Sequence, residues 1–131
     1  MNQVLLSMYR AVWRVFIWLT NARLQSPQIL HWYKLRISPP SENATSTVLF
    51  HCASLGEYER IKTIADHVAL NTKYQVEISF FSPSGFERVA QDKKSNFSFS
   101  YSPLDTPKFV KQYLLTKKVK AAVISTNEVW P

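Results

Sequence analysis

The sequence predicts an α/β fold with a Rossmann-like parallel sheet, and three observations lead to this prediction. Strand and helix patterns alternate from residue 47 onward, with strands expected at 47–51, 76–81, 97–101 and 121–125 and helices at 57–72, 86–94 and 107–119. The stretches 48–50 and 121–124 are continuously apolar, as in parallel strands buried on both faces. Residues 97–101 alternate aromatic and serine residues, a pattern typical of a half-buried edge strand.

Alternation of this kind implies parallel strands joined by right-handed crossovers. The character of the strands favours the order 3-2-1-4, with the first and fourth strands adjacent at the point where the winding reverses. Ligands of such sheets bind there, outside the carboxyl ends of the strands. The fourth strand is apolar throughout and is the last element of the sequence, so we expect an incomplete sheet that further strands continue in a longer parent protein.

Two of the predicted helices have a clear apolar face. The helix at 107–119 also has proline in its first turn, which suits the start of a helix. The apolar residues recur at helical spacing: Ile61, Ile64, Ala65 and Val68 in the first helix, and Phe109, Val110, Tyr113 and Leu114 in the last.

Length and composition describe one folded domain preceded by a leader. The chain has 131 residues, which is too short for two ordinary domains. Its residues are 46% hydrophobic and 19% charged, a composition typical of a globular protein. The single cysteine, Cys52, excludes an internal disulfide bond. No Cys or His pair has the spacing of zinc ligands, so we expect no metal site.

The leader, residues 1–40, is basic and apolar. It contains five of the 16 Lys and Arg residues and none of the nine acids, although the whole chain has a net charge of +7. A helix is expected at 3–21, with a wide apolar arc and one narrow polar stripe that includes Arg10 and Arg14. These two charges lie in the middle of the segment and argue against a transmembrane span.

We therefore predict a helix lying in one membrane leaflet, with the membrane surface bound through residues 1–36. The second contact, at the headgroups, is expected from His31, Trp32, Tyr33, Lys34 and Arg36. The alternative is a helix that packs on the domain or on sequence beyond this chain. A linker is expected at 38–43, which divides the chain into a leader, 1–40, and an α/β domain, 41–131.

Four loops follow the predicted strands, at 51–57, 82–85, 102–107 and 126–131. The only two glycines, Gly56 and Gly85, lie in these loops, each close to a predicted helix start. Glycine there allows positive φ or a close approach of the backbone, and helix N-termini offer free N–H groups to anions. The loops therefore predict a binding site, although tight βα turns use glycine for structural reasons too.

The loop sequences resemble those of the Kdo transferases, which move 3-deoxy-D-manno-oct-2-ulosonic acid (Kdo) from CMP-Kdo to lipid A precursors. Residues 51–57, HCASLGE, are similar to the family signature HAVSVGE, and the other three stretches are similar to TPTGxE, YLPxDxP and ELWP. These stretches are FSPSGFE at 81–87, YSPLDTP at 101–107 and EVWP at 128–131. The resemblance covers nearly the whole chain but only the first third or so of such an enzyme.

The resemblance implies the N-terminal domain of a two-domain glycosyltransferase of the GT-B type, which receives the lipid acceptor, while a C-terminal domain binds CMP-Kdo. No cofactor or metal is implied, and the expected location is the cytoplasmic face of the bacterial inner membrane. Glu57 corresponds to the general base, which takes the proton of the attacking sugar hydroxyl. The acceptor-binding candidates are Ser54, Gly56, Ser84, Gly85 and Glu128.

Simpler roles are open for several of these residues. Glu57 also suits the positive end of a helix dipole, and Asp105 also suits a loop cap. His51 and Cys52 are expected to be packing residues at a strand end. The chain departs from the family where its stretch 60–64 lacks the usual small residue and proline, and where Thr126 replaces a common acid. Without a donor domain, the chain alone is not expected to complete transfer.

Two other functions are open from the sequence. A non-catalytic membrane-binding module of the same fold would need the leader but not Glu57. Nucleic-acid binding is suggested by the basic leader, but the nearly balanced charge of residues 41–131 argues against it. We therefore expect a lipid A precursor and a membrane surface as partners, and no nucleic acid.

Overall fold

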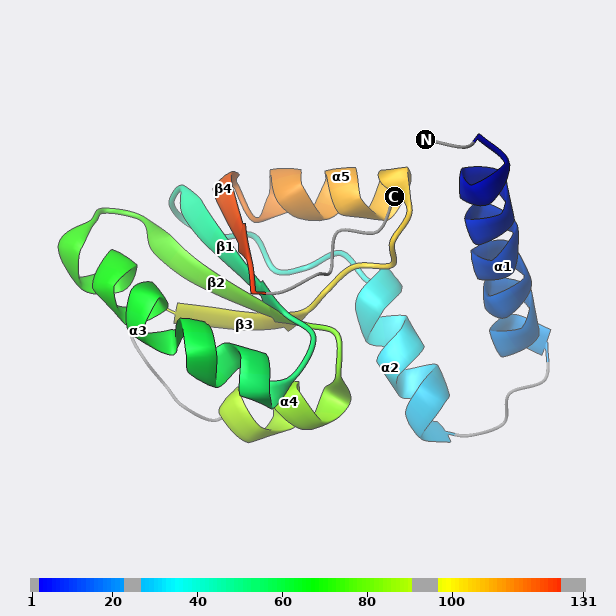
Figure 1. The fold of residues 1–131 in the computed structure, drawn as a ribbon, viewed down its shortest axis with the longest axis horizontal. Coiled ribbons are helices and arrows are strands. Elements are labelled where there is room, and N and C mark those ends of the chain that lie inside the picture. The colour runs from blue at the N-terminus through cyan, green and yellow to red at the C-terminus, as the bar shows by residue number, and fades with distance from the viewer. Residues whose placement is uncertain (1–2, 23–26, 91–96, 126–131) are drawn as a thin grey trace.

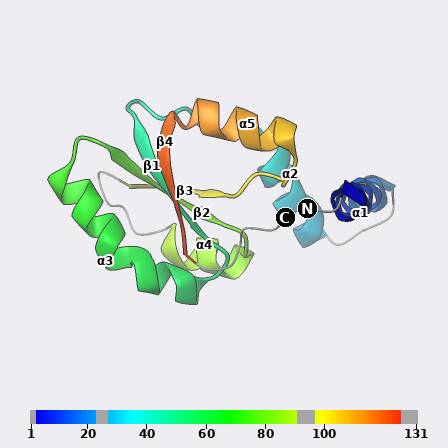
Figure 2. The same ribbon diagram turned by 45° about the horizontal axis from the view of Figure 1, so that its top comes forward.

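The computed structural model of the chain describes residues 3–22, 27–90 and 97–125. Two helices, α1 (Gln3–Ala22) and α2 (Pro27–Ile37), precede an α/β domain. The domain is built from β1 (Thr47–Cys52), α3 (Leu55–Asn71), β2 (Gln75–Phe80), α4 (Pro83–Val89), β3 (Phe97–Tyr101), α5 (Pro107–Thr116) and β4 (Val119–Ile124). Helices α3 and α4 cover one face of the sheet and α5 lies on the other (Figures 1 and 2).

The four described strands are parallel and follow the predicted order, β3-β2-β1-β4. The α/β class, the strand order and the edge position of β3 are therefore confirmed. As the predicted order requires, β4 lies at the other edge of the described sheet, and several of its residues are exposed. These are Lys120, Ala121, Ala122 and Ile124.

Local interactions explain where the helices begin and end. Helix α3 begins two residues earlier than predicted, because the Ser54 side chain caps it by accepting from the Glu57 N–H. Helix α4 begins at Pro83, earlier than predicted, since proline suits the first turn. Helix α5 ends at Thr116 rather than at 119, because Lys118 adopts the left-handed region with φ of 50° and β4 begins directly after it.

An apolar core fills the space between the sheet and helices α3 and α4. Its strand residues are Phe50, Cys52, Val76, Ile78 and Phe80, and its helix residues include Tyr58, Ile61, Ala65, Ala69 and Val89. The predicted apolar face of α3 is correct for Ile61 and Ala65, which are buried, but Ile64 lies 55% exposed.

The opposite face of the sheet holds a buried polar cluster that the sequence did not predict. Glu77 on β2 forms an ion pair with Lys117 after α5, with 3.0 Å between carboxylate oxygen and ammonium nitrogen, and both side chains are almost fully buried. The Glu77 carboxylate also accepts from Ser98, Ser100 and Tyr113. Such a pair satisfies two charges that would otherwise be costly to bury.

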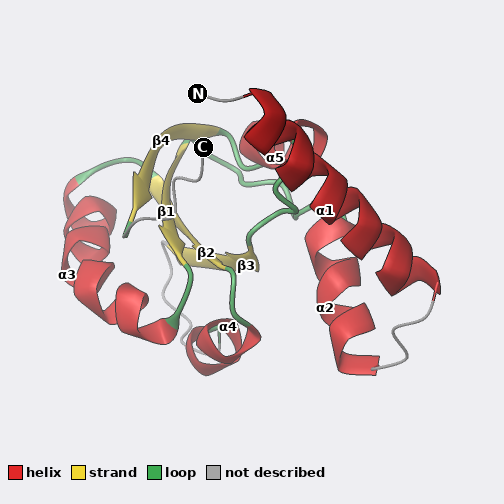
Figure 3. Ribbon diagram, turned by 45° about the vertical axis from the view of Figure 1, so that its right-hand side comes forward, coloured by secondary structure: helices red, strands yellow, loops and turns green. Residues whose placement is uncertain are grey.

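Helix α2 packs against the carboxyl end of the sheet, and α1 lies beyond it (Figure 3). Tyr33 and Arg36 are buried, and the Trp32 indole N–H donates to the Phe81 carbonyl. Of the residues expected at the headgroups, therefore, these three contact protein instead, while His31 and Lys34 are exposed. The expected linker has no helix or strand, but within it Asn43 is buried and bonded to Thr47.

Within the described residues, we find no helix with the length and apolar character needed to cross a membrane. Helix α1 nevertheless has several exposed large apolar side chains. These are Met8, Val12, Val15 and Trp18, each between 55% and 67% exposed. They leave α1 with an uncovered apolar surface.

Candidate functional site

The carboxyl ends of β1 and β4 meet at the predicted switch point. Ser125, directly after β4, donates its backbone N–H to the His51 carbonyl. Its side chain also donates to the backbone carbonyl of Glu57, over 3.3 Å. The residue predicted as general base therefore lies at the junction between the central strand and β4.

Glu57 is held in a defined orientation by the loop before it. Its Oε2 atom accepts a hydrogen bond from the Ala53 N–H over 2.6 Å, and its own N–H donates to Ser54 Oγ over 3.4 Å. This reciprocal arrangement resembles a capping box at the start of α3. The half-buried carboxylate is thus held in one orientation beyond the carboxyl end of β1, and it also caps the helix.

Cys52, the last residue of β1, lies in the apolar core. Burial and then the nearby charge of Glu57 raise the pKa of its thiol to about 12. A thiol with so high a pKa is protonated near neutral pH and is a poor nucleophile. The structure therefore agrees with the packing role expected for Cys52. His51 beside it contacts Ser79 through Nδ1 over 2.9 Å.

The predicted acceptor-binding residues that the structure describes lie near one another, at the starts of α3 and α4. Ser54 and Gly56 are exposed at the start of α3. Ser84 lies beside a shallow polar hollow between α3 and α4, which is also lined by Tyr58, Glu59 and Arg88. Glu128 lies outside the described residues.

Gly85 has a clear structural reason to be glycine. It is buried in α4, and a Cβ atom there would lie 2.8 Å from Phe80 Cδ1 and 3.2 Å from the Leu55 backbone nitrogen. The glycine therefore lets α4 approach the sheet and the start of α3. Neither Gly56 nor Gly85 has positive φ. The close backbone approach predicted for these loops is therefore found at Gly85, where the backbone of α4 approaches Phe80 and Leu55 of the same chain.

Another hollow lies on the α5 face of the sheet, at the carboxyl ends of the strands. It has a volume of about 280 Å³, and residues in or directly after all four strands contribute to it: His51, Phe81, Ser102 and Ile124. Arg36 from α2 and Asp105 from the loop before α5 complete its rim. The sequence placed Asp105 in this region, but nothing in its pattern singled out Arg36 from the other bases of the leader.

Within residues 3–22, 27–90 and 97–125, no three His, Cys, Asp or Glu side chains are grouped so that they could share a metal ion.

The sequence pattern of one family, described as 3-Deoxy-D-manno-octulosonic-acid transferase (kdotransferase), matches residues 27–131. The chain belongs to this family, within its N-terminal domain. The match includes α2, which the structure packs against the sheet, as well as the stretches 51–57, 82–85, 102–107 and 126–131 of the sequence.

A curated relative agrees with the broader class. A bifunctional glycosyltransferase/methyltransferase of Fusobacterium nucleatum is 26% identical over 86 residues, which cover 64% of this chain and 13% of that protein. The matched region thus spans only a small part of the relative's length. No solved structure matches the chain. Family membership and this relative together assign the chain to the glycosyltransferases.

Proposed function

We propose that this Kdo transferase family chain is the acceptor-binding part of an enzyme that transfers Kdo from CMP-Kdo to a lipid A precursor. One observation carries the proposal: Glu57 lies at the β1–β4 switch point with its carboxylate held by the Ala53 N–H, in the loop that resembles the family signature. In this proposal Glu57 takes the proton of the attacking sugar hydroxyl, which is a poor nucleophile until a positioned base removes that proton.

The other members of the proposed site follow from their positions. Ser54 and Gly56 stand beside Glu57 at the start of α3, so they are proposed to contact the acceptor sugar. Ser84, Gly85 and Glu128 are retained as acceptor-site candidates, with Gly85 acting through the backbone of α4. CMP-Kdo is proposed to bind a C-terminal domain, and no cofactor or metal is needed for the transfer.

Membrane association is proposed through α1 at the cytoplasmic face of the inner membrane. Its exposed side chains Val12, Val15 and Trp18 supply apolar area, while Arg10 and Arg14 supply charges that anionic headgroups attract. His31 and Lys34, which are exposed on α2, are proposed to contact the headgroups as well. The same surface favours the second candidate function, a non-catalytic membrane-binding module.

Kdo transfer to a tetra-acylated lipid A precursor tests the proposal. The chain would be assayed alone and fused to the C-terminal half of a related transferase, with Glu57→Gln and Glu57→Ala variants. Glutamine keeps an oxygen that can accept from Ala53 but cannot take a proton, so we expect about 100-fold or more lower transfer with nearly unchanged stability. Alanine should lose both the base and the cap.

Asp66→Asn is the matched control, since Asp66 is a carboxylate on the same helix, further along it and outside the hollow beside Ser84. It should leave transfer unchanged. A folded fusion that transfers no Kdo, but still binds anionic vesicles through α1, would favour the non-catalytic module. Binding to duplex DNA with a steep salt dependence would instead support a nucleic-acid function.

A further inference from the structure

Arg36 lines the 280 Å³ hollow at the carboxyl end of the sheet, which we call the Arg36 hollow. Polar groups line one part of it, among them Arg36, His51 and Ser79, whereas Leu114 and Ile124 belong to an apolar wall. Leu114 is 37% exposed and Ile124 is 43% exposed. The hollow thus combines an apolar surface with a cation at its rim.

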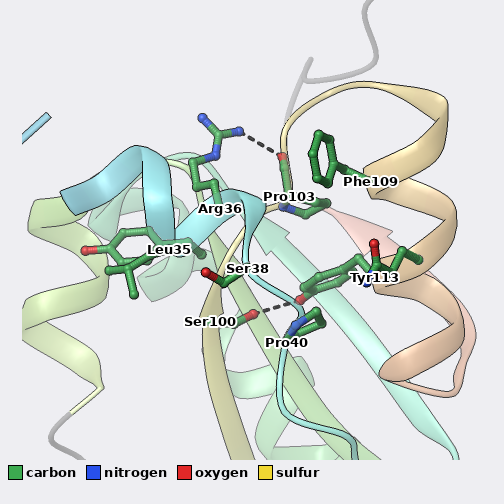
Figure 4. A pocket seen from close by; sticks show the side chains of 10 residues that line it. Leu35, Arg36, Ser38, Pro40, Ser100, Pro103, Phe109 and Tyr113 are labelled. Carbon is green, nitrogen blue, oxygen red and sulfur yellow. Dashed lines mark hydrogen bonds between the residues drawn. The ribbon is translucent and has the colours of Figure 1, made fainter. Parts of the chain in front are cut away.

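The Arg36 guanidinium is buried and only partly hydrogen bonded. The residue is 3% exposed, and its Nε and Nη2 atoms donate to the Ser102 and Pro103 carbonyls over 2.8 and 2.9 Å. The rings of Trp32 and Phe81 lie 4.6 Å from its central carbon. Figure 4 shows the bond to Pro103, with the rest of the guanidinium group directed away from the smaller cavity drawn there.

The third nitrogen, Nη1, is buried and has no hydrogen-bond partner among the residues that the structure describes. Burial lowers the pKa of Arg36 to about 10, so the group is still a cation near neutral pH. A buried donor without an acceptor destabilises a fold by about 1–3 kcal/mol, and more when the group is charged. An anionic oxygen that bonds to Nη1 would remove this penalty.

The neighbouring acid does not fill that role. Asp105 lines the same hollow and raises the pKa of Arg36 electrostatically, but it is exposed and accepts a hydrogen bond from Tyr9 on α1. Guanidinium groups bind carboxylate and phosphate oxygens through planar, charge-assisted hydrogen bonds, and of the two anions we take phosphate as the ligand to be tested. The apolar wall in turn suits a hydrocarbon chain attached to that phosphate.

We propose that the Arg36 hollow binds a phosphate attached to an apolar chain, with Arg36 Nη1 donating to a phosphate oxygen and the chain lying against Leu114 and Ile124. Because Nη1 is covered in the free chain, side chains over it shift on binding. The inference rests on the proposed function only in taking the lipid acceptor as the biological source of the phosphate.

Decyl phosphate, below its micelle concentration, is the probe for this site, and the whole 131-residue chain is used. Binding is followed by the NMR signals of the Arg36 Nε–H and Trp32 indole N–H groups, both of which are held in hydrogen bonds. Inorganic phosphate and decyl maltoside serve as the two comparison ligands. The first lacks the chain and the second lacks the charge.

Two variants of equal net charge test the location. Leu114→Glu places a carboxylate on the apolar wall, whereas Leu115→Glu places one on the same helix at a residue that is 68% exposed. We expect decyl phosphate to shift both signals and to bind at least tenfold more weakly to Leu114→Glu than to Leu115→Glu. Arg36→Lys, which keeps the charge but loses the planar fork, should also bind at least tenfold more weakly.

Equal binding to the Leu114 and Leu115 variants would overturn the proposed location. If inorganic phosphate bound as tightly as decyl phosphate, the proposed contact with an apolar chain would be overturned, and free phosphate would be the ligand. Decyl maltoside that binds as tightly would overturn the role of Arg36. Binding of decyl phosphate needs neither CMP-Kdo nor Glu57, which does not line the hollow, so failure here is distinct from failure of Kdo transfer.

Discussion

The face of the sheet beneath α3 and α4 is packed with apolar side chains, whereas the face beneath α5 holds the ion pair of Glu77 and Lys117. The first face is stabilised by burial that has no directional requirement. The second depends on groups that must meet in one arrangement, because a buried charge without its partner is strongly destabilising. The Arg36 hollow lies on this second face, so the candidate ligand site is built on the more specific half of the domain.

The largest expected effect comes from separating the ion pair. Glu77→Leu leaves the Lys117 ammonium group buried without a counter-charge, and we expect a loss of about 3–5 kcal/mol in the free energy of unfolding. Domains of this size have about 5–15 kcal/mol in total, so urea titration at pH 7 should show a large shift or a largely unfolded chain.

Two comparisons make this test specific. The double variant Glu77→Leu with Lys117→Met should regain most of the lost stability, because it buries no charge. Glu59→Leu removes an exposed pair with Lys62, 3.9 Å apart, and should change stability by less than about 1 kcal/mol. If the Glu77 and Glu59 variants lost equal stability, the buried pair would not distinguish the two faces.

On the apolar face, the two glycines should respond in opposite directions to alanine. The Cβ of Gly85→Ala would lie 2.8 Å from Phe80 Cδ1 and close to backbone, so we expect a loss of about 1–3 kcal/mol. Gly56→Ala meets only Ser54 Oγ, at 4.0 Å, and should be neutral or stabilising by up to about 1 kcal/mol. Urea midpoints of the two variants measure the difference, and equal shifts would contradict the close packing of α4.

The smallest expected effect is a pH dependence from Cys52. Its pKa is raised from 9.0 to about 12 in the folded chain, so above pH 9 the unfolded chain releases a proton that the folded chain keeps. The stability that this thiol contributes is therefore complete below about pH 9 and is lost as the pH rises toward 12. Urea titrations at pH 8 and pH 10 should show this fall in the wild type.

Cys52→Ala provides the control, since alanine does not titrate. The stability difference between wild type and variant should become smaller at pH 10 than at pH 8. A difference that stays constant would mean that the thiol is not shielded by the apolar core. In the folded wild type, reaction of Cys52 with a thiol reagent at pH 8 should be slow and should accelerate in urea.

The parts of the fold that follow local sequence patterns were predictable. The continuous apolar character of 48–50 and the alternation of 97–101 led to the observed strand order, which places β4 at an edge of the described sheet. Helix starts were less predictable, because Ser54 and Pro83 set them through capping and backbone geometry. Ile64 fits the helical spacing of the core residues, but it lies 55% exposed.

The site was predictable where it depends on loops, and less so where it depends on contacts between distant segments. The position of Glu57 at the β1–β4 junction follows from the strand order. By contrast, Arg36 meets Ser102 across 66 positions of sequence, and Glu77 meets Lys117 only after two crossovers. No local spacing distinguishes these residues from ordinary surface charges, so their burial required the structure.

The position of β1 has a consequence for how the chain is made. β1 is paired with β2 on one side, but its other neighbour, β4, begins more than sixty residues after β1 ends. A ribosome adds about 5–20 residues per second, so a growing chain spends several seconds with the central strand open along one edge. Lys117 emerges just before β4. Synthesis of 107–124 therefore supplies, almost together, the counter-charge of Glu77 and the second neighbour of β1, and the sheet should become stable at that moment.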